Sequence, residues 1–511
     1  MTIHSHKKAG HGLSFLDDDA YTDLVVARNL SSSFSYSLEP NGRMPATENV
    51  IWRLMLALGG WITGDFRAAS YLLGAVCSVV TLLLCLRLAR FLFPFPPFIV
   101  YAAVLVAIAP RLVVDGVSGT SMALATTLVT AAGLLHIEGL SGRRHTLPVG
   151  SAVFIGLAMW IRIEFSLLWV VFILHALIVG PFKERGEYFA EIIAHAITGI
   201  VVIILCILPM LIWNYQLLKV PWPQAIGAPL TVDAMASGNQ SVMSGFRMSM
   251  SNLLPAFARW NQVPAMGVFL VNFFAWCGAV FILGLSMGRV EERPYTLVLF
   301  ILVLLPVLYA LVYPYVGWVN AGLVFDSLGP ICVIAAAFGM FRVPFIAEGL
   351  YRRWKQGLPA ATGFNVWWSV MGTIVILACF VSNRSLLRIR GEQLQETMAA
   401  RESLATALRV GEIKGEKILT DAPGWISYEL KRPVIDLNGE GSPHILTCLD
   451  EQGRIDPSKL KSYLQEDRPD LLTIWKEENV YLAEALPCEN PLSIASGNSE
   501  KRMKIRQLRW P

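Results

Sequence analysis

A series of long apolar stretches dominates residues 68–382. A helix needs about 20 mainly apolar residues to cross the hydrocarbon core of a bilayer, and several stretches approach or exceed that length. The chain is 54% hydrophobic and only 16% charged, whereas soluble domains carry about 25% charged residues. The sequence therefore predicts an α-helical polytopic membrane protein. We expect ten spans, at residues 68–87, 97–113, 117–137, 147–161, 165–181, 192–214, 265–287, 295–313, 322–341 and 364–382.

The fourth and fifth spans form one uninterrupted apolar run, residues 147–182. A single helix over this run would measure about 54 Å at 1.5 Å per residue, far more than the thickness of a bilayer core. Arg162 and Glu164 stand at its midpoint. We therefore predict a hairpin that turns at these two residues and brings their charges to a membrane surface.

Loop charges give the orientation. Alternate loops are rich in Arg and Lys, and such loops face the cytoplasm by the positive-inside rule. The basic residues on this side are Arg87, Arg90, Arg143, Arg144, Lys183, Arg185, Arg289, Arg293, Arg342, Arg352, Arg353 and Lys355. Ten crossings then place both ends of the chain outside. Since nothing hydrophobic precedes residue 50, either an upstream helix is missing from this chain or the first span pulls the segment across; we favour the missing helix.

Residues 1–66 are predicted to form an external loop. Three consecutive carboxylates, Asp17 to Asp19, precede apolar positions at helical spacing. An Asp before a helix is a natural N-cap. Further on, residues 50–61 are apolar on one face with Arg53 on the other, and carry Trp near both ends. This pattern predicts a helix lying in the membrane interface rather than crossing it.

The tail, residues 384–511, has a different composition. Residues 385–410 form a charged, amphipathic helical pattern, and short strand-like pieces alternate with helical ones from residue 417 to residue 474. Such alternation predicts a small α/β domain outside the membrane. We expect the last twenty residues to be loosely structured.

Several function classes are disfavoured. The net charge of +4, without a basic patch interleaved with aromatics, gives no sign of a nucleic-acid partner. No CxxC, HExxH, P-loop or GxGxxG motif occurs. No metal-ligand spacing supports a metal site. We interpret the four histidines of the predicted membrane and cytoplasmic segments as structural: His136, His145, His175 and His195.

At the acidic run the sequence resembles a known family. Asp18-Asp19-Ala20-Tyr21, followed by Ala27-Arg28-Asn29-Leu30, resembles the first external loop of the C-type glycosyltransferases, which use polyprenyl-phosphate sugars. The nearest members are bacterial arabinofuranosyl- and mannosyltransferase-like proteins. Further pieces resemble family segments in the same order: Ser118-Gly119, Arg162 to Phe165, Trp213 to Tyr215 with Pro221 and Pro223, Thr420 to Tyr428, and Pro433 to Gly439.

The chain departs from the family pattern in three places. Ser121 stands where the resemblance leads us to expect a Glu, and Val324 to Asp326 offers no Arg near the last external loop. The family's first transmembrane helix is also missing. These departures bear on the substrate and on catalytic competence.

Sugar transfer from a lipid phosphate to a hydroxyl requires a base near the acceptor and a cation near the leaving phosphate. The residue types alone do not select one Asp of the run. The resemblance implies Asp18 as the base, with Asp19 in support. Arg28, Arg162, Lys219, Arg247 and Arg259 are the external cations that can bind phosphate. Snorkelling to lipid headgroups is the simpler interpretation of the last three.

Arg162 is the stronger candidate, because a charge inside an apolar hairpin is costly and is by default functional; the alternative is a structural pair with Glu164. For Asp115, helix capping is favoured over substrate contact. We predict Asp18 and Asp19 as catalytic residues, and Arg28, Asp115, Arg162 and Glu164 as substrate-binding residues, with no cofactor.

The predicted function is the transfer of a sugar from a polyprenyl-phosphate donor to a glycan, lipid or protein acceptor by single displacement with inversion. The active site and the C-terminal domain would lie on the external, periplasmic side of the bacterial cytoplasmic membrane. One alternative is a transporter or flippase, although no repeat and few deep charges are visible. The other is a catalytically silent relative in an envelope-assembly complex.

Overall fold

The computed structural model describes most of the chain. The described residues are 14–38, 49–93, 96–140, 149–179, 185–218, 266–288, 295–312, 327–354, 361–410, 416–437, 442, 445, 448, 455–475, 479–486 and 504–508.

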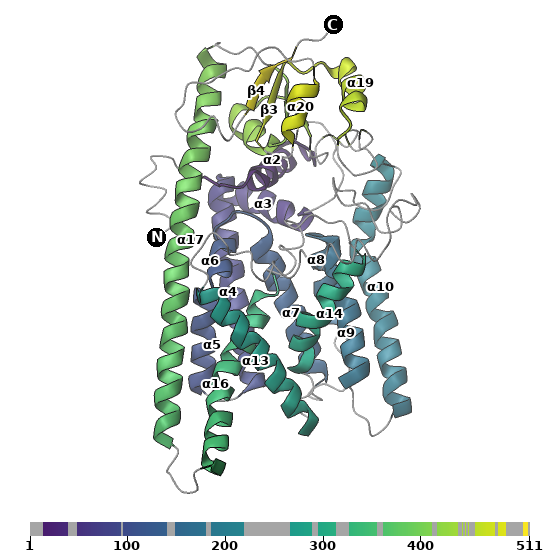
Figure 1. Cartoon of the computed structure of the whole chain (residues 1–511). Coiled ribbons are helices and arrows are strands. Elements are labelled where there is room, and N and C mark those ends of the chain that lie inside the picture. The colour runs from purple at the N-terminus through teal and green to yellow at the C-terminus, as the bar shows by residue number, and fades with distance from the viewer. Residues whose placement is uncertain are drawn as a thin grey trace.

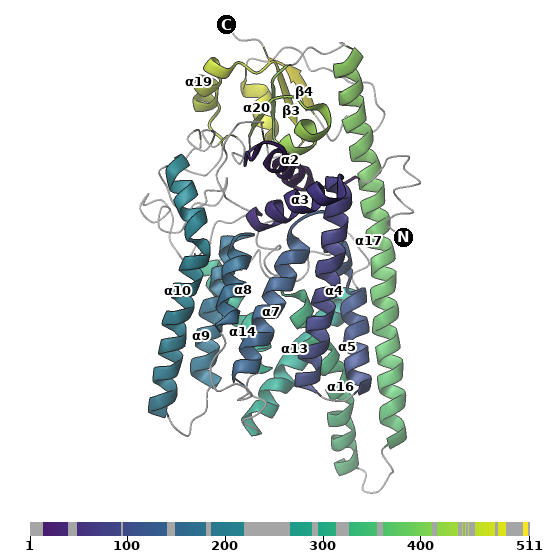
Figure 2. The ribbon, with the colours of Figure 1, turned by 180° about the vertical axis from the view of Figure 1, so that it is seen from behind.

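An upright bundle of helices forms the body of the molecule (Figures 1 and 2). Its helices are α4 (Phe66–Leu92), α5 (Pro96–Ile108), α6 (Pro110–Asp115), α7 (Met122–Leu140), α8 (Gly150–Met159), α9 (Ser166–Val179), α10 (Arg185–Leu218), α13 (Met266–Gly288), α14 (Leu297–Val312), α16 (Gly329–Trp354) and the long α17 (Ala361–Val410). Each predicted span overlaps a helix of the described residues. The second span is broken at Ala109, since Pro110 starts α6.

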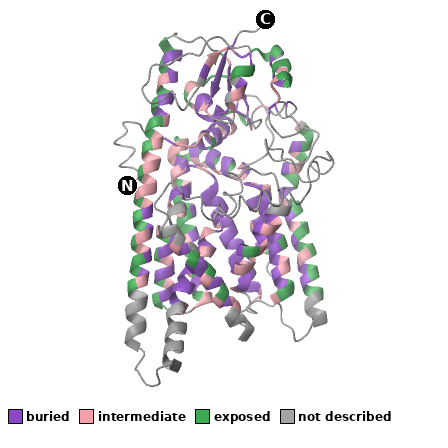
Figure 3. Cartoon of the chain, viewed as in Figure 1, coloured by how far each residue is buried: buried purple, intermediate pink, exposed green. Residues whose placement is uncertain are grey.

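The bundle has the surface of a membrane protein. Four helices are long and apolar enough to cross a bilayer, at Phe66–Leu92, Met122–Leu140, Ala190–Leu217 and Val370–Val410. The outward sides of α10 and α17 are exposed (Figure 3). On α4 the exposed large side chains form one apolar stripe: Leu72, Val76, Val79 and Leu83. An apolar outer face at this spacing fits lipid rather than water. The predicted fold class is confirmed.

The predicted hairpin turn is also confirmed. Helix α8 ends at Met159, a single 3₁₀ turn, η1, covers Ile163–Phe165, and α9 begins at Ser166. Arg162 and Glu164 are therefore in the turn, as their charge predicts.

Two helices lie across the end of the bundle that faces the C-terminal domain, α2 (Asp18–Ser33) and α3 (Val50–Thr63) (Figure 1). The exposed face of α3 is an apolar stripe at helical spacing, which suits a helix in the membrane interface: Leu54, Leu58, Trp61 and Ile62. We expected Arg53 on a polar face opposite to the apolar one, and this was wrong. This residue is buried between α3 and α2, where its Nε lies 2.7 Å from Asp23 Oδ1.

Helix α17 joins the two parts of the molecule. It contains 50 residues, which corresponds to about 75 Å, more than twice the thickness of a bilayer core. In Figures 1 and 2 it runs along one side of the bundle and continues beside the C-terminal domain. The expected boundary between the transmembrane region and the tail, at residue 383, falls inside this continuous helix.

The C-terminal domain is the predicted small α/β unit. Its sheet has the order β2-β1-β3-β4. Strands β1 (Ile418–Thr420), β2 (Val434–Asp436) and β3 (Leu471–Ile474) are parallel, and β4 (Lys504–Gln507) is antiparallel to β3. Short helices complete it: α18 (Pro423–Trp425), η4 (Ile426–Leu430), α19 (Pro457–Asp467) and α20 (Val480–Ala485).

Strand β4 corrects the expectation of a loosely structured end. It lies within the last twenty residues, and Ile505, at its centre, is 3% exposed. Alternate residues of β1 face opposite sides. Ile418 packs into the main core, whereas Leu419 packs into a second core with Leu460 and Leu482. One face of the sheet is thus directed at the membrane body.

Candidate active site

Segments that carry the family resemblance meet around the start of α3. The backbone N–H groups of Asn49 and Val50 donate to the carbonyls of Ile161 and Trp160 in the α8–α9 turn. The Ser121 hydroxyl donates to the Asn49 side chain. Trp52 Nε1 donates to the carbonyl of Gly119 at 3.3 Å. Segments distant in the sequence therefore meet at the start of α3, next to α2.

The acidic run opens α2, but its three carboxylates have different environments. Asp17 occupies the N-cap position, yet its side chain makes no capping hydrogen bond. Instead, Asp17 Oδ2 lies 3.1 Å from Arg390 Nη2 on α17. Asp19 is exposed. Asp17 therefore contacts α17, whereas Asp19 faces solvent.

Asp18 faces the C-terminal domain. Its Oδ2 accepts the Gly424 N–H at 2.7 Å, and its Oδ1 accepts the Trp425 N–H at 2.9 Å. Arg401 Nη2 lies 3.5 Å from Oδ1, and the Arg401 side chain is only 3% exposed. The pKa of Arg401 is lowered by burial, an effect that the nearby Asp18 carboxylate opposes. Asp18 is therefore held by groups of both the domain and α17.

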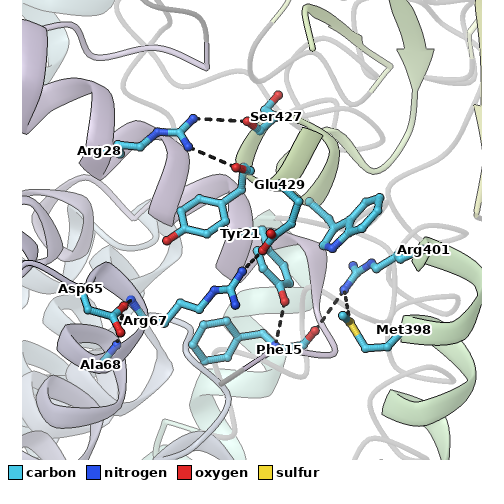
Figure 4. A network of polar contacts seen from close by, with 12 residues as sticks. Phe15, Tyr21, Arg28, Asp65, Arg67, Ala68, Met398, Arg401, Ser427 and Glu429 are labelled. Atoms are coloured by element: carbon cyan, nitrogen blue, oxygen red, sulfur yellow. Dashed lines mark hydrogen bonds and ion pairs between the residues drawn. The ribbon is translucent and has the colours of Figure 1, made fainter. Parts of the chain in front are cut away.

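Arg28, ten residues along α2, also binds the C-terminal domain. Its Nη1 donates to the Tyr428 carbonyl at 3.1 Å and its Nη2 to the Ser427 carbonyl at 3.2 Å (Figure 4). The guanidinium carbon lies 5.2 Å from the centre of the Tyr428 ring. Partial burial lowers the pKa of Arg28, and the coulombic effect of Tyr428 acts in the opposite direction. The structure thus brings Asp18 and Arg28 together on one short segment of the domain.

The other predicted binding residues lie elsewhere, in the membrane bundle. Arg162 Nη2 donates to Glu164 Oε1 at 3.1 Å, and both side chains are buried. Asp115 is buried at the last position of α6, and its carbonyl accepts the Ser118 hydroxyl at 3.0 Å. It is therefore not an N-cap. Lys219, Arg247 and Arg259 lie outside the described residues.

A groove adjoins the acidic run. Its wall combines the residues just before α2 with α4, the end of α6 and one face of α17: Ser14, Phe15, Leu16, Asp17, Tyr71, Val114, Val117, Ser118, Leu387, Arg390, Gly391 and Leu394. The groove has a volume of about 60 Å³, which suffices for a few waters, not for a lipid-linked sugar. The lining is mainly apolar, with the Asp17–Arg390 ion pair at its wall.

Sequence reasoning missed several residues of this region. Arg67 of α4 pairs with Glu429 of η4, and Arg401 lies 5.0 Å from the centre of the Tyr21 ring (Figure 4). Arg390 contributes to the groove. The amphipathic pattern of residues 385–410 predicts that one face of this helix packs. It does not indicate which arginines meet the acidic run.

The histidines predicted to be structural that the structure describes lie inside the bundle. His136 Nε2 and His175 Nδ1 are 3.0 Å apart, and His175 Nε2 is 3.0 Å from the Thr296 hydroxyl. His195 packs on Trp169. His145 lies outside the described residues. Across the parts of the chain that the structure describes, no group of three or more His, Cys, Asp or Glu side chains is arranged to hold a metal ion.

Comparisons with known proteins agree on the fold. Residues 50–213 match a family model described as dolichyl-phosphate-mannose-protein mannosyltransferase. A crystal structure of ArnT from Cupriavidus metallidurans bound to undecaprenyl phosphate superposes with a TM-score of 0.54 at 13% identity, over 96% of this chain and 93% of ArnT. The apo structure gives a TM-score of 0.53 at 11% identity over the same shares.

An archaeal protein has a similar fold. The oligosaccharyltransferase AglB from Archaeoglobus fulgidus, in complex with an inhibitory peptide and a dolichol-phosphate, superposes with a TM-score of 0.52 at 13% identity. The match covers 90% of this chain and 66% of AglB. A search of curated protein sequences found no match. The chain therefore has the fold of membrane proteins whose structures hold polyprenyl phosphates.

Proposed function

We propose that this chain is a C-type glycosyltransferase that transfers a sugar from a polyprenyl-phosphate donor to an acceptor hydroxyl on the outer face of a bacterial cytoplasmic membrane. The observation that carries the proposal is the fold, which matches undecaprenyl-phosphate-bound ArnT over nearly all of both chains. The family-model match to residues 50–213 and the position of the acidic run support it.

The proposed reaction is a single displacement. The acceptor oxygen attacks the anomeric carbon, and the bond between that carbon and the phosphate oxygen breaks as the new glycosidic bond forms. The hydroxyl proton passes to a carboxylate, and the polyprenyl phosphate leaves with the bonding electron pair. Attack opposite to the leaving group inverts the anomeric configuration. The protein must therefore supply one accessible carboxylate and one cation.

Within the predicted catalytic pair, we assign the role of base to Asp19. Both oxygens of Asp18 already accept backbone N–H groups of the C-terminal domain, whereas Asp19 is exposed at the start of α2. The partial positive charge of a helix N-terminus favours an ionised carboxylate there, which is the form that accepts a proton. A hydroxyl from solvent or the membrane surface can approach Asp19 directly.

The groove at the acidic run is the proposed place of the donor phosphate, with its prenyl chain against Leu387 and Leu394. The Asp17–Arg390 pair crosses its wall with side chains 39% and 28% exposed, so the pair contributes at most about 1 kcal/mol. A phosphate can therefore replace the Asp17 carboxylate on Arg390 and open the narrow space. Arg162 and Glu164 are the second proposed binding pair, at the turn beside α3.

Purified chain in proteoliposomes tests the proposal. The probes are undecaprenyl phosphate carrying a labelled pentose or a labelled hexose, and the measurement is label released from the lipid in the presence of acceptor membranes. We expect Asp19→Asn to lower turnover about 10²–10⁴-fold. Arg390→Gln should raise the donor KM about tenfold, because a charge-assisted hydrogen bond is lost. Arg388→Gln is the matched control, since Arg388 is 79% exposed and pairs with Glu392.

The same assay separates the alternatives. No release from either donor by a folded wild-type chain would contradict the enzyme and support the catalytically silent relative. That alternative is favoured by one observation: Ser121, where the resemblance leads us to expect a Glu, is engaged with Asn49 and so joins α7 to α3. Uptake of the donor into the vesicle lumen without transfer would support the flippase.

A further inference from the structure

One short helical segment of the C-terminal domain, residues 423–430, lies directly on α2. It consists of α18 and η4, which follow each other without a break. Gly424 is the point of closest approach, since a Cβ built there would come 2.5 Å from the Asp18 carbonyl oxygen. Only a glycine fits at this contact without displacing the domain.

Side chains of α2 form hydrogen bonds near both ends of the segment. The Asp18 carboxylate accepts the N–H groups of Gly424 and Trp425 at the amino pole. The Arg28 guanidinium donates to the carbonyls of Ser427 and Tyr428 toward the carboxyl pole. An anion at the amino end of a helix and a cation at its carboxyl end each stabilise the helix dipole and satisfy terminal backbone groups.

The order of the contacts is the same on both helical segments. Asp18, at the start of α2, contacts the start of residues 423–430, and Arg28, further along α2, contacts their later part. Ten residues separate Asp18 from Arg28, about 15 Å along α2, whereas their partners span residues 424–428, about 6 Å of helical rise, so the side chains bridge the difference. Two contacts at separate points restrict both the position of the segment along α2 and its distance from it.

Flanking contacts strengthen the arrangement. Arg67 of α4 pairs with Glu429 (Figure 4). The Arg67 guanidinium carbon also lies 5.1 Å from the centre of the Tyr428 ring. The guanidinium carbon of Arg28 lies 5.2 Å from the centre of the same ring. Arg28 of α2 and Arg67 of α4 thus both contact one tyrosine of the C-terminal domain.

We infer that Asp18 and Arg28 are positioning residues: together they clamp residues 423–430 to α2 and so fix the C-terminal domain above the acidic run. The acidic motif then has two tasks. Asp18 and Arg28 anchor the domain, and the exposed Asp19 is the proposed base. Only the kinetic consequence of this inference rests on the proposed function; the docking itself does not.

Amide hydrogen exchange of the full chain in micelles, with cleavage to peptides afterwards, tests the docking. We expect Asp18→Asn and Arg28→Gln each to speed exchange in residues 423–430 at least tenfold, while strand β3 in the same domain stays protected. Asp19→Asn is the matched control and should leave the exchange of residues 423–430 unchanged. Unchanged exchange in both Asp18→Asn and Arg28→Gln would overturn the inference.

A charge exchange provides the second test. Arg67→Glu and Glu429→Arg should each speed exchange in residues 423–430, and the double variant should restore protection. Loss of β3 protection in the single variants would show unfolding of the domain rather than undocking and would contradict the clamp. Failure of the double variant to restore protection would contradict it as well.

Kinetics separate a positioning residue from a substrate ligand. We expect Arg28→Gln to lower kcat at least tenfold with a donor KM changed less than threefold, because the domain moves while the donor groove remains. A raised KM with normal exchange would instead identify Arg28 as a phosphate ligand and overturn its role in the clamp. If no variant or wild type shows transfer, the exchange results still decide the docking.

Discussion

At the scale of single residues, the buried pair of Asp23 and Arg53 joins α2 to α3. The two side chains are 0% and 1% exposed, and Arg53 Nη1 also donates to the Tyr36 hydroxyl at 3.1 Å. Removing two charges from water costs several kcal/mol for each ion, and only good geometry recovers this cost. Such a pair contributes little net stability, yet it penalises any arrangement in which the partners separate.

This asymmetry gives a prediction for stability. Arg53→Met should lower the free energy of unfolding by about 3–5 kcal/mol, because it leaves the Asp23 carboxylate buried beside an apolar side chain. The double variant Asp23→Leu, Arg53→Met should recover most of that loss. Reversible unfolding in mixed micelles measures both values, and a double variant no better than Arg53→Met would contradict the argument.

The same scale shows what the sequence reveals of the site. The apolar positions at helical spacing after the acidic run predict a helix, and the structure has one, α2, which contains both Asp18 and Arg28. Their partners, however, lie some 400 residues later in the chain, beyond any local pattern. A carboxylate that binds two N–H groups and one that is exposed have the same letter in the sequence. Only the packing of residues 423–430 distinguishes Asp18 from Asp19.

At the scale of elements, α13 and α16 show how helices of the bundle approach each other closely. A Cβ added to Gly278 would overlap the Ala335 carbonyl oxygen, and one added to Gly339 would overlap that of Phe274. Helices in membranes associate through small residues that bring the backbones together, since lipid provides no hydrophobic driving force. Both glycines are therefore required by the contact rather than by their dihedral angles.

Enlarging one of them should separate the helices. Gly278→Val is expected to lower the free energy of unfolding by about 1–3 kcal/mol through overpacking. Val280→Leu is the matched control, because Val280 lies on the same helix and is 57% exposed on its outer face. The same micelle unfolding measurement applies, and equal effects of the two substitutions would show that the glycine contact is unimportant.

Element boundaries were predictable where charge or proline marks them. The α8–α9 turn follows from Arg162 and Glu164, and the break before α6 coincides with Pro110. The last predicted span ends at residue 382, but the helix that contains it, α17, continues to Val410. Hydropathy falls at residue 382, because α17 leaves the bilayer, but the backbone hydrogen bonds of a helix do not depend on the polarity of its side chains. Hydropathy therefore predicts where a helix lies in the membrane, but not where the helix ends.

At the scale of the whole molecule, two surfaces of opposite character are joined by one helix. The bundle exposes apolar stripes on α4, α10 and α17, whereas α19 of the C-terminal domain exposes Lys459 and Lys461. Helix α17 runs beside both regions without a break and so is one attachment between them (Figure 1). The clamp on α2 adds a second attachment, so that the acidic run lies between two fixed bodies.

Loop charge predicts which side of the membrane the C-terminal domain faces. Arg90 is exposed at the end of α4 opposite to α2, on the side where the loops are basic, and Lys461 lies in the C-terminal domain (Figure 1). The positive-inside rule places Arg90 in the cytoplasm. Because the domain lies at the other end of the bundle, Lys461 should face outside. In a chain freed of its own cysteines, Lys461→Cys should react with a membrane-impermeant maleimide in intact spheroplasts, and Arg90→Cys only after permeabilisation. The reverse labelling would place the acidic run in the cytoplasm, and with it any donor that the protein uses.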